Sequence, residues 1–151
     1  MADDDGHMRA ALAEAEAALA HEDVPIGAVV VRGGVVIARG ENRREADRDP
    51  TAHAEVLALR EAARLVGDWR LEDCALYATL EPCAMCAGAA ILARIPLVVF
   101  AAPDPKAGAV RSVAELFAEP WANHHPKWRL GALRAESEAL LEAFFRGRRA
   151  G

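Results

Sequence analysis

The chain has 151 residues, the size of one ordinary domain, and 53% of them are hydrophobic. This apolar share is too high for a disordered chain, and no apolar stretch approaches the ~20 residues of a membrane-spanning helix. The formal charge of -5 has the wrong sign for binding nucleic acid by bulk phosphate neutralisation, so a polyanion must meet a local basic patch. The acidic N-terminus lacks the pattern of a signal peptide, so a cytoplasmic protein without membrane contact is expected.

The first third of the sequence predicts a helix followed by a hairpin. Apolar residues at helical spacing predict an amphipathic helix over residues 8–21. Residues 1–7 lack this pattern and are expected to be disordered, which leaves Met1 and Met8 as alternative starts. β-rich runs at 26–31 and 35–38 flank a Gly-Gly turn and predict two antiparallel strands. The charged residues 41–50 are expected to be irregular.

The rest of the chain alternates between helices and strands. We expect helices at 53–65, from Pro82 to about 93, near 113–117 and at 136–148, and strands at 75–79, 98–100 and 128–133. Such alternation indicates a sheet with parallel members and helices on both faces. The predicted fold class is α/β, a three-layer α/β/α sandwich with a mixed five-stranded sheet behind the N-terminal hairpin. Residues 1–151 are expected to form a single domain.

Two short motifs carry the chemistry of the sequence. The first is His53-Ala54-Glu55, and the second is Pro82-Cys83-Ala84-Met85-Cys86. One histidine and two cysteines are the three protein ligands typical of a catalytic zinc ion, and we predict one Zn²⁺ per subunit, held by His53, Cys83 and Cys86. The pattern H-x-E followed by P-C-x-x-C is the signature of zinc deaminases that act on nucleobases.

In this interpretation Glu55 is the catalytic residue and does not bind the metal. Zinc lowers the pKa of a bound water toward neutrality, and Glu55 moves the proton of that water to the ring nitrogen and then to the leaving ammonia. Both motifs fall at predicted helix starts, where the helix dipole favours anionic sulfur.

Two simpler interpretations of the cysteines remain open from the residues alone. Cys74, His124 or His125 would turn the site into a structural zinc site if one of them supplied a fourth ligand. A thioredoxin-like dithiol is the other, but it explains neither Pro82 nor the His53-Ala54-Glu55 triplet.

Motifs spread over almost the whole chain resemble the bacterial tRNA-specific adenosine deaminases. They are Val24-Pro25-Ile26-Gly27-Ala28, the stretch from Asp49 to Glu55, the stretch from Thr79 to Ala89, the stretch from Asp104 to Ala109, Asn123-His124 and Phe144-Phe145-Arg146. The resemblance implies a cytidine deaminase-like fold, a homodimer, and conversion of the wobble adenosine of a tRNA anticodon to inosine. It names tRNA, through its anticodon stem-loop, as the partner.

The resemblance also implies a set of substrate-binding residues. They are Ile26, Asn42, Ala54, Asp104, Lys106, Asn123, Phe145 and Arg148. Read alone, Asn42 is typical of a turn. Phe145 and Arg148 have the aromatic and basic character suited to stacking on bases and neutralising phosphates. The chain departs from the family at Pro103 and Arg111, and both lie in a loop that touches RNA in the family.

Other functions fit part of this pattern. The same zinc signature serves deaminases of a free nucleobase or nucleoside, such as guanine, cytosine or cytidine, which need no basic cleft. An RNA-binding module with a structural zinc is the non-enzymatic alternative, but it leaves Glu55 without a role. The arginine-rich C-terminus favours tRNA.

Overall fold

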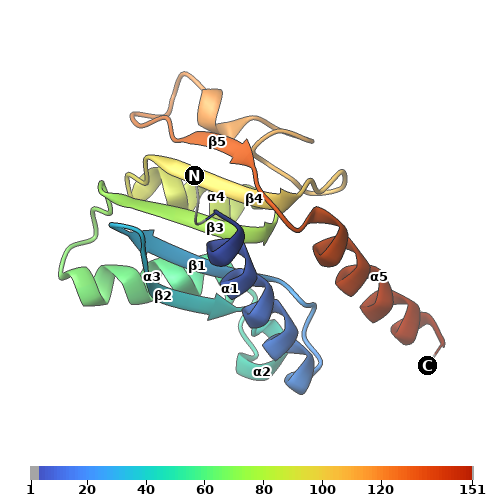
Figure 1. Ribbon diagram of the computed structural model, residues 1–151. Helices are drawn as coiled ribbons and strands as arrows, with labels where there is room; N and C mark the ends of the chain where they lie inside the picture. The colour runs from blue at the N-terminus through green and yellow to red at the C-terminus, as the bar shows by residue number, and fades with distance from the viewer. Residues whose placement is uncertain (1–3, 151) are drawn as a thin grey trace.

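The computed structural model describes residues 4–150, which form a mixed sheet between helices (Figure 1). The strands are β1 (Gly27–Arg32), β2 (Val35–Glu41), β3 (Cys74–Leu80), β4 (Leu97–Ala102) and β5 (Lys127–Leu130). Their spatial order is β2-β1-β3-β4-β5. β1 is antiparallel to both β2 and β3, whereas β3, β4 and β5 run parallel. The predicted five-stranded sheet with an N-terminal hairpin is therefore confirmed.

Helices cover both faces of the sheet. They are α1 (Asp4–Ala17), the 3₁₀-helix η1 (Ala18–His21), α2 (Arg44–Asp47), α3 (Ala54–Val66), α4 (Ala84–Leu92), the 3₁₀-helix η2 (Leu116–Ala118) and α5 (Arg134–Ala150). α1 lies on one face and α3 and α4 lie on the other, which gives the predicted three layers (Figure 1). α5 follows β5 and extends away from the sheet edge. Within residues 4–150, no helix is long and apolar enough to cross a membrane.

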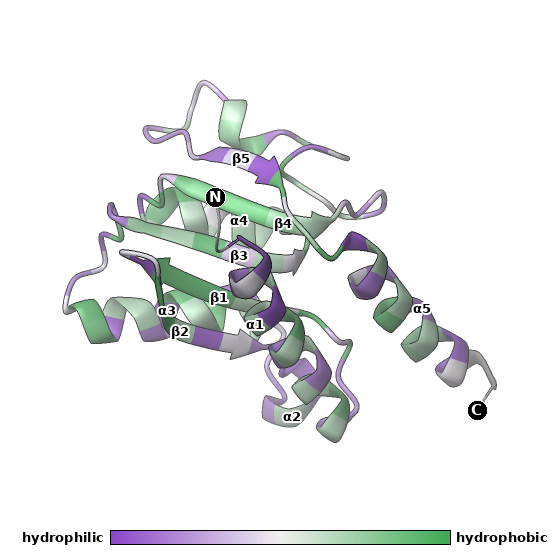
Figure 2. Cartoon of the chain, viewed as in Figure 1, coloured by the Kyte–Doolittle hydropathy of each residue, from purple (hydrophilic) through white to green (hydrophobic). Residues whose placement is uncertain are grey.

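The alternation of side chains along the strands builds two hydrophobic cores. Side chains on one face of the sheet pack with α1, namely Val29, Val31, Tyr77, Val99 and Ala101. Side chains on the opposite face pack with α3 and α4, namely Ala28, Val30, Leu76, Ala78, Val98 and Phe100. Because the residues on both faces are apolar, the interior strands β1 and β4 are hydrophobic over much of their length (Figure 2). Hydrophilic residues gather on β5 instead.

The N-terminal helix begins earlier than the sequence predicted. Residues 4–7, for which the sequence predicted disorder, belong to α1. The Tyr77 hydroxyl donates to Oδ1 of Asp4 at 2.6 Å, and the Arg129 guanidinium pairs with the same carboxylate. Met8 is fully buried. These partners are distant in sequence, so no local pattern indicated them. Residues 1–3, and with them Met1, lie outside the described part of the chain.

Other boundaries also differ from the prediction. α4 begins at Ala84 rather than Pro82, because Cys83 has extended backbone angles (φ -74°, ψ 179°) and occupies the position before the helix. The stretch 41–50 contains the short helix α2, and the piece near 113–117 is the 3₁₀-helix η2. β5 ends at Leu130 and α5 begins at Arg134.

Candidate metal centre and substrate pocket

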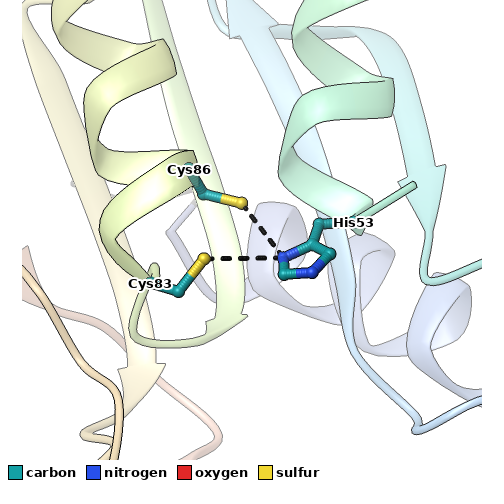
Figure 3. Close-up of side chains that lie close together, drawn as sticks. All are labelled: His53, Cys83 and Cys86. Carbon is teal, nitrogen blue, oxygen red and sulfur yellow. Dashed lines mark hydrogen bonds between the residues drawn. The ribbon is translucent and has the colours of Figure 1, made fainter. Parts of the chain in front are cut away.

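Three side chains that could hold a metal ion meet between α3 and α4 (Figure 3). His53 immediately precedes α3, Cys83 immediately precedes α4, and Cys86 lies in the first turn of α4. Nδ1 of His53 lies 3.5 Å from Sγ of Cys83 and 3.5 Å from Sγ of Cys86. The three potential ligand atoms all lie within 4.8 Å of one another. The structure thus brings together the three residues that the sequence predicted as ligands.

This donor set fits zinc. A tetrahedral ion with ordinary Zn–N and Zn–S bonds places nitrogen and sulfur ligands about 3.5 Å apart, and both nitrogen–sulfur distances have this value. The residues considered for a fourth ligand are engaged elsewhere: His124 with the Ile95 carbonyl, His125 with the Phe117 carbonyl, and Cys74 with Asp73. Within residues 4–150, the metal-ligating group at this site consists of the three predicted residues. The arrangement matches a catalytic rather than a structural zinc site.

Close packing of α3 on β2 fixes the histidine motif. A Cβ atom at Gly40 in β2 would lie only 2.2 Å from the Ala54 carbonyl oxygen and 2.8 Å from the Ala58 amide nitrogen. Only glycine allows the first turn of α3 to approach β2 so closely. The Leu57 amide donates to the His53 carbonyl at 3.0 Å, which continues the helical hydrogen-bonding up to His53. Backbone contacts rather than side chains therefore hold this motif in place.

Glu55 lies in the first turn of α3 and is 4% exposed. Burial raises the pKa of its carboxyl to about 7, and the nearby Cys83 thiolate adds to the effect. The hydrogen bonds that Cys83 makes with Cys86 and with His53 lower the pKa of the Cys83 thiol to about 3. A carboxyl group with a pKa near neutrality suits a residue that both accepts and donates a proton.

Glu55 also lines a cavity of about 680 Å³, within the range on the order of 300–1,000 Å³ that small-molecule sites occupy. His53 and Cys83 line it too. Six of the eight predicted substrate-binding residues line the same cavity: Ile26, Asn42, Ala54, Asp104, Lys106 and Phe145. The metal centre thus lies in a pocket large enough for a nucleoside.

Asn42 follows β2 and is 3% exposed. Its Nδ2 donates to the Val24 carbonyl at 3.1 Å, and its Oδ1 accepts from the Arg44 amide at 3.3 Å. These are the hydrogen bonds of a turn residue. Each of its polar atoms has capacity for one further hydrogen bond, and the side chain borders the cavity. The turn role and the predicted substrate role are therefore compatible.

Asn123 and Arg148 do not line the cavity. Asn123 is exposed in the segment before β5. The Arg148 guanidinium lies 5.0 Å over the Phe144 ring and donates to the Glu22 carbonyl at 3.1 Å. Phe144 in turn packs edge-on against Phe145, with ring centroids 5.3 Å apart. Arg148 thus contacts Phe144, which packs against the pocket-lining residue Phe145.

The pocket also contains residues to which the sequence gave no role. They are Val24, Arg44, Leu80, Glu81, Ala102, Pro103, Pro105, Ala107, Glu138, Leu141 and Glu142. Glu81 stands out because it is charged and only 2% exposed. Burial alone would raise the pKa of its carboxyl, but hydrogen bonds from the Ser112 side chain and from backbone amides outweigh burial and lower it. Its local signals were its place between a buried strand and Pro82 and its position within the stretch from Thr79 to Ala89 that resembles the family.

Comparison with known proteins agrees with this site. Residues 1–102 match a family model described as the cytidine and deoxycytidylate deaminase zinc-binding region. The tRNA-specific adenosine deaminase of Bacillus subtilis is 46% identical over 146 residues, which are 97% of this chain and 91% of that protein. The tRNA-specific adenosine deaminase of Aquifex aeolicus is 46% identical over 137 residues, 91% of each chain.

Solved structures give the same relationship. One from a study of A-to-I editing by tRNA:A34 deaminases superposes with a TM-score of 0.87 at 45% identity, covering 90% of this chain and 99% of the other. Guanine deaminase from Nitrosomonas europaea superposes with a TM-score of 0.76 at 29% identity, covering 91% and 82%. The chain therefore belongs to the cytidine and deoxycytidylate deaminase family with its zinc-binding region, in the branch that holds the tRNA-specific adenosine deaminases.

Proposed function

We propose that this chain is a hydrolytic deaminase that converts the wobble adenosine of a tRNA anticodon to inosine. The observation that carries the proposal is the meeting of the three zinc ligands with buried Glu55 in a cavity of nucleoside size. The overall reaction joins adenosine and water to give inosine and ammonia. The similarity to tRNA-specific adenosine deaminases over 97% of the chain favours this substrate.

The chain's own residues would divide the chemistry as follows. His53, Cys83 and Cys86 would hold a zinc ion, which would act as a Lewis acid and lower the pKa of a water molecule. Glu55 accepts a proton from that water as its oxygen attacks C6 of the purine. Glu55 then delivers the proton to N1 and, in the next step, to the departing amine. Burial raises the pKa of its carboxyl, which suits a group that first accepts and then donates a proton.

The walls of the cavity would hold the flipped adenosine. Ile26 offers an apolar side chain to the base, and the Asn42 amide can hydrogen-bond a base edge with the capacity that its turn bonds leave. The backbone of Ala54, which lines the cavity beside Glu55, would lie near the reacting carbon. Asp104 would contact a sugar next to the target, and Phe145, which is 45% exposed, would stack on a neighbouring base.

Residues outside the cavity would act on the RNA beyond the target nucleotide. Lys106 is exposed at the rim and Asn123 is exposed away from it, so phosphates or sugars of the stem-loop are their expected contacts. Arg148, held over Phe144, places a positive charge beside the stacking residue Phe145. These groups would form the local basic patch that a chain with a net charge of -5 needs.

A deaminase of a free base is the second candidate. The structural similarity to guanine deaminase favours it, but at 29% identity against 46% for the tRNA-specific relatives. The two functions differ in what surrounds the base. A free base brings no neighbouring nucleotides for Phe145 and Arg148 on α5 to contact, whereas RNA recognition commonly stacks unpaired bases on aromatic side chains.

A single-turnover assay would decide between them. Zinc-loaded protein would be mixed with an anticodon stem-loop bearing adenosine at the wobble position, and separately with adenosine, guanine, cytosine and cytidine. We expect inosine only in the RNA and none with the Glu55→Ala variant. Deamination of a free base or nucleoside with unchanged RNA would overturn the substrate, and no turnover of any substrate would support the structural-zinc RNA-binding module.

We also propose that the chain acts as a homodimer in the cytoplasm, where tRNA is found. Closed two-fold assembly is the commonest arrangement of homo-oligomers. Leu92 and Trp121 are 69% and 65% exposed, and large apolar side chains at a surface are typical of contact regions. Light scattering coupled to size-exclusion chromatography would give twice the chain mass of 16.2 kDa for a dimer. The mass of a single chain at micromolar concentration would contradict it.

A further inference from the structure

The carboxylate of Glu81 is enclosed by the segment that follows β4. Its Oε1 accepts hydrogen bonds from the Asp104 amide at 3.0 Å and from the Ser112 hydroxyl. Its Oε2 accepts from the amides of Val110, Arg111 and Ser112 at 3.1, 2.7 and 2.9 Å. One buried side chain thus binds both ends of residues 104–112, which we name the rim loop.

Gly108 makes this enclosure possible. A Cβ atom at this position would lie 2.2 Å from Cδ of Glu81 and 2.4 and 2.5 Å from its two oxygens. The middle of the rim loop therefore packs directly on the carboxylate, while its ends are hydrogen-bonded to it. The Ala109 amide also donates to the Pro82 carbonyl at 2.9 Å, so the loop is attached to the same segment that carries Cys83.

The rim loop forms one wall of the cavity. Asp104, Pro105, Lys106 and Ala107 line it, and so does Glu81 itself. The Asp104 carboxylate accepts from the Lys106 amide at 3.0 Å, so the position of Asp104 also shapes the turn at Lys106. Moving Asp104 would therefore move the two charged residues of this wall together.

We propose that Glu81 is a positioning residue for substrate recognition: its carboxylate holds the rim loop so that Asp104 and Lys106 face the nucleotides around the target adenosine. This inference rests on the proposed RNA substrate. Glu81 itself takes no part in proton transfer, because its oxygens are occupied by five donors. It connects the strand that leads to the zinc ligands with the wall that would select the RNA.

The variant Glu81→Gln distinguishes the hydrogen bond to the Asp104 amide from those to the amides of residues 110–112. An amide has one acceptor oxygen and one donor group. If the oxygen keeps the three amides of Val110–Ser112, the amide NH₂ must face the Asp104 N–H, and two donors then repel each other. We therefore expect the Asp104 amide to lose its protection from hydrogen exchange while the amides of residues 110–112 largely keep theirs. Glu81→Ala should expose both groups.

Kinetics on the anticodon stem-loop test the consequence for the substrate. For Glu81→Gln we expect KM to rise about tenfold or more, because loop contacts with the RNA are lost, and kcat to change less than about threefold. Zinc content should stay at one ion per chain. The control is Glu115→Gln, the same change of charge at an exposed residue just beyond the rim loop, and it should leave KM unchanged.

Gly108→Ala offers a second approach to the same contact. Alone it should raise KM about as much as Glu81→Gln, because its Cβ collides with the carboxylate. In the Glu81→Ala background it should add less than about twofold, since its collision partner is gone. Purely additive effects, an unchanged KM, or an unchanged Asp104 exchange rate in Glu81→Gln would each overturn the proposal. Because hydrogen exchange needs no substrate, it decides the loop-holding role even if the wild-type protein fails to deaminate RNA.

Discussion

The floor and the wall of the cavity are built in different ways. The floor is the name we give to the zinc ligands His53, Cys83 and Cys86 together with Glu55. All four lie at the starts of two helices that pack on the sheet, and all but Cys86 line the cavity. The wall consists of loop residues around Asp104 and of side chains on α5, many of them exposed. The floor can therefore determine the reaction, whereas the wall can determine which adenine-bearing molecule reaches it.

A substitution in the floor should have the largest effect on activity. Glu55→Gln keeps the size of the side chain and removes its ability to accept a proton. A positioned acid–base group contributes about 10²–10⁴-fold in rate, so we expect kcat to fall by that factor while KM for the stem-loop stays within a few fold. Single-turnover rates measure the first quantity.

Two controls belong to this variant. Zinc content, measured by atomic absorption, should remain at one ion per chain, since Glu55 is not a ligand. Cys86→Ala should instead lose both the zinc and the activity. Activity of Glu55→Gln near that of the wild type would contradict the assignment of the floor.

Substitutions in the wall should weaken binding of the RNA rather than slow the chemical step. Phe145→Ala removes the half-exposed ring on α5, and stacking of a base on an aromatic side chain contributes about 1–3 kcal/mol. We expect KM for the stem-loop to rise about tenfold or more, with kcat little changed. Phe145→Trp should retain binding, whereas Phe145→Leu should behave like the alanine variant. If leucine binds as well as phenylalanine, the ring does not stack on the RNA.

The residues of the floor can be recognised from the sequence more readily than the shape of the wall, for a physical reason. The ligands and Glu55 belong to two short motifs, and the chemistry of zinc requires those residue types at that spacing. Asn123 and Arg148 lie outside the cavity, because the path of a loop and the direction of α5 depend on distant packing. The enclosure of Glu81 involves backbone amides some thirty residues away, and backbone amides leave no sequence pattern.

The same distinction applies to the fold. Short β-rich runs predicted the five strands, and the alternation of strands with helices predicted a mixed sheet, since both signals are local. The start of α1 at Asp4 was missed because its stabilising partners, Tyr77 and Arg129, come from β3 and β5. The short helix α2 was missed because three of its four residues are charged and none of the four is buried, so it carries no apolar pattern.

A substitution where α3 packs on β2 should have a smaller effect, and it should act on stability. Gly40→Ala places a Cβ atom 2.2 Å from the Ala54 carbonyl, and overpacking of this kind costs about 1–3 kcal/mol. We expect a lower melting temperature and weaker zinc retention, because α3 must shift. The control is Gly88→Ala in α4, where a Cβ meets no atom within 4 Å. That substitution should be neutral or slightly stabilising, since alanine favours a helix.

The smallest effect concerns a cluster beside the turn that carries Asn42. Nδ1 of His21 lies 2.6 Å from Asp23 and its Nε2 lies 2.8 Å from Glu41. The hydrogen bond with Glu41, and then that with Asp23, raises the pKa of His21 despite its partial burial. Asp23 also accepts from the amides of Glu45 and Ala46, so the cluster connects η1 to α2.

A pKa that is higher in the folded than in the unfolded chain means that the folded state binds the proton more tightly. The stabilisation from His21 is then fully present below the unfolded pKa of about 6.5 and is lost as the pH rises through the folded value. His21→Gln should therefore lower the free energy of unfolding more at about pH 6 than at about pH 9, as measured by urea denaturation. A deficit that is the same at both pH values would mean that folding leaves the pKa of the imidazole unchanged, and the hydrogen bonds would then stabilise the turn at Asn42 equally in both protonation states.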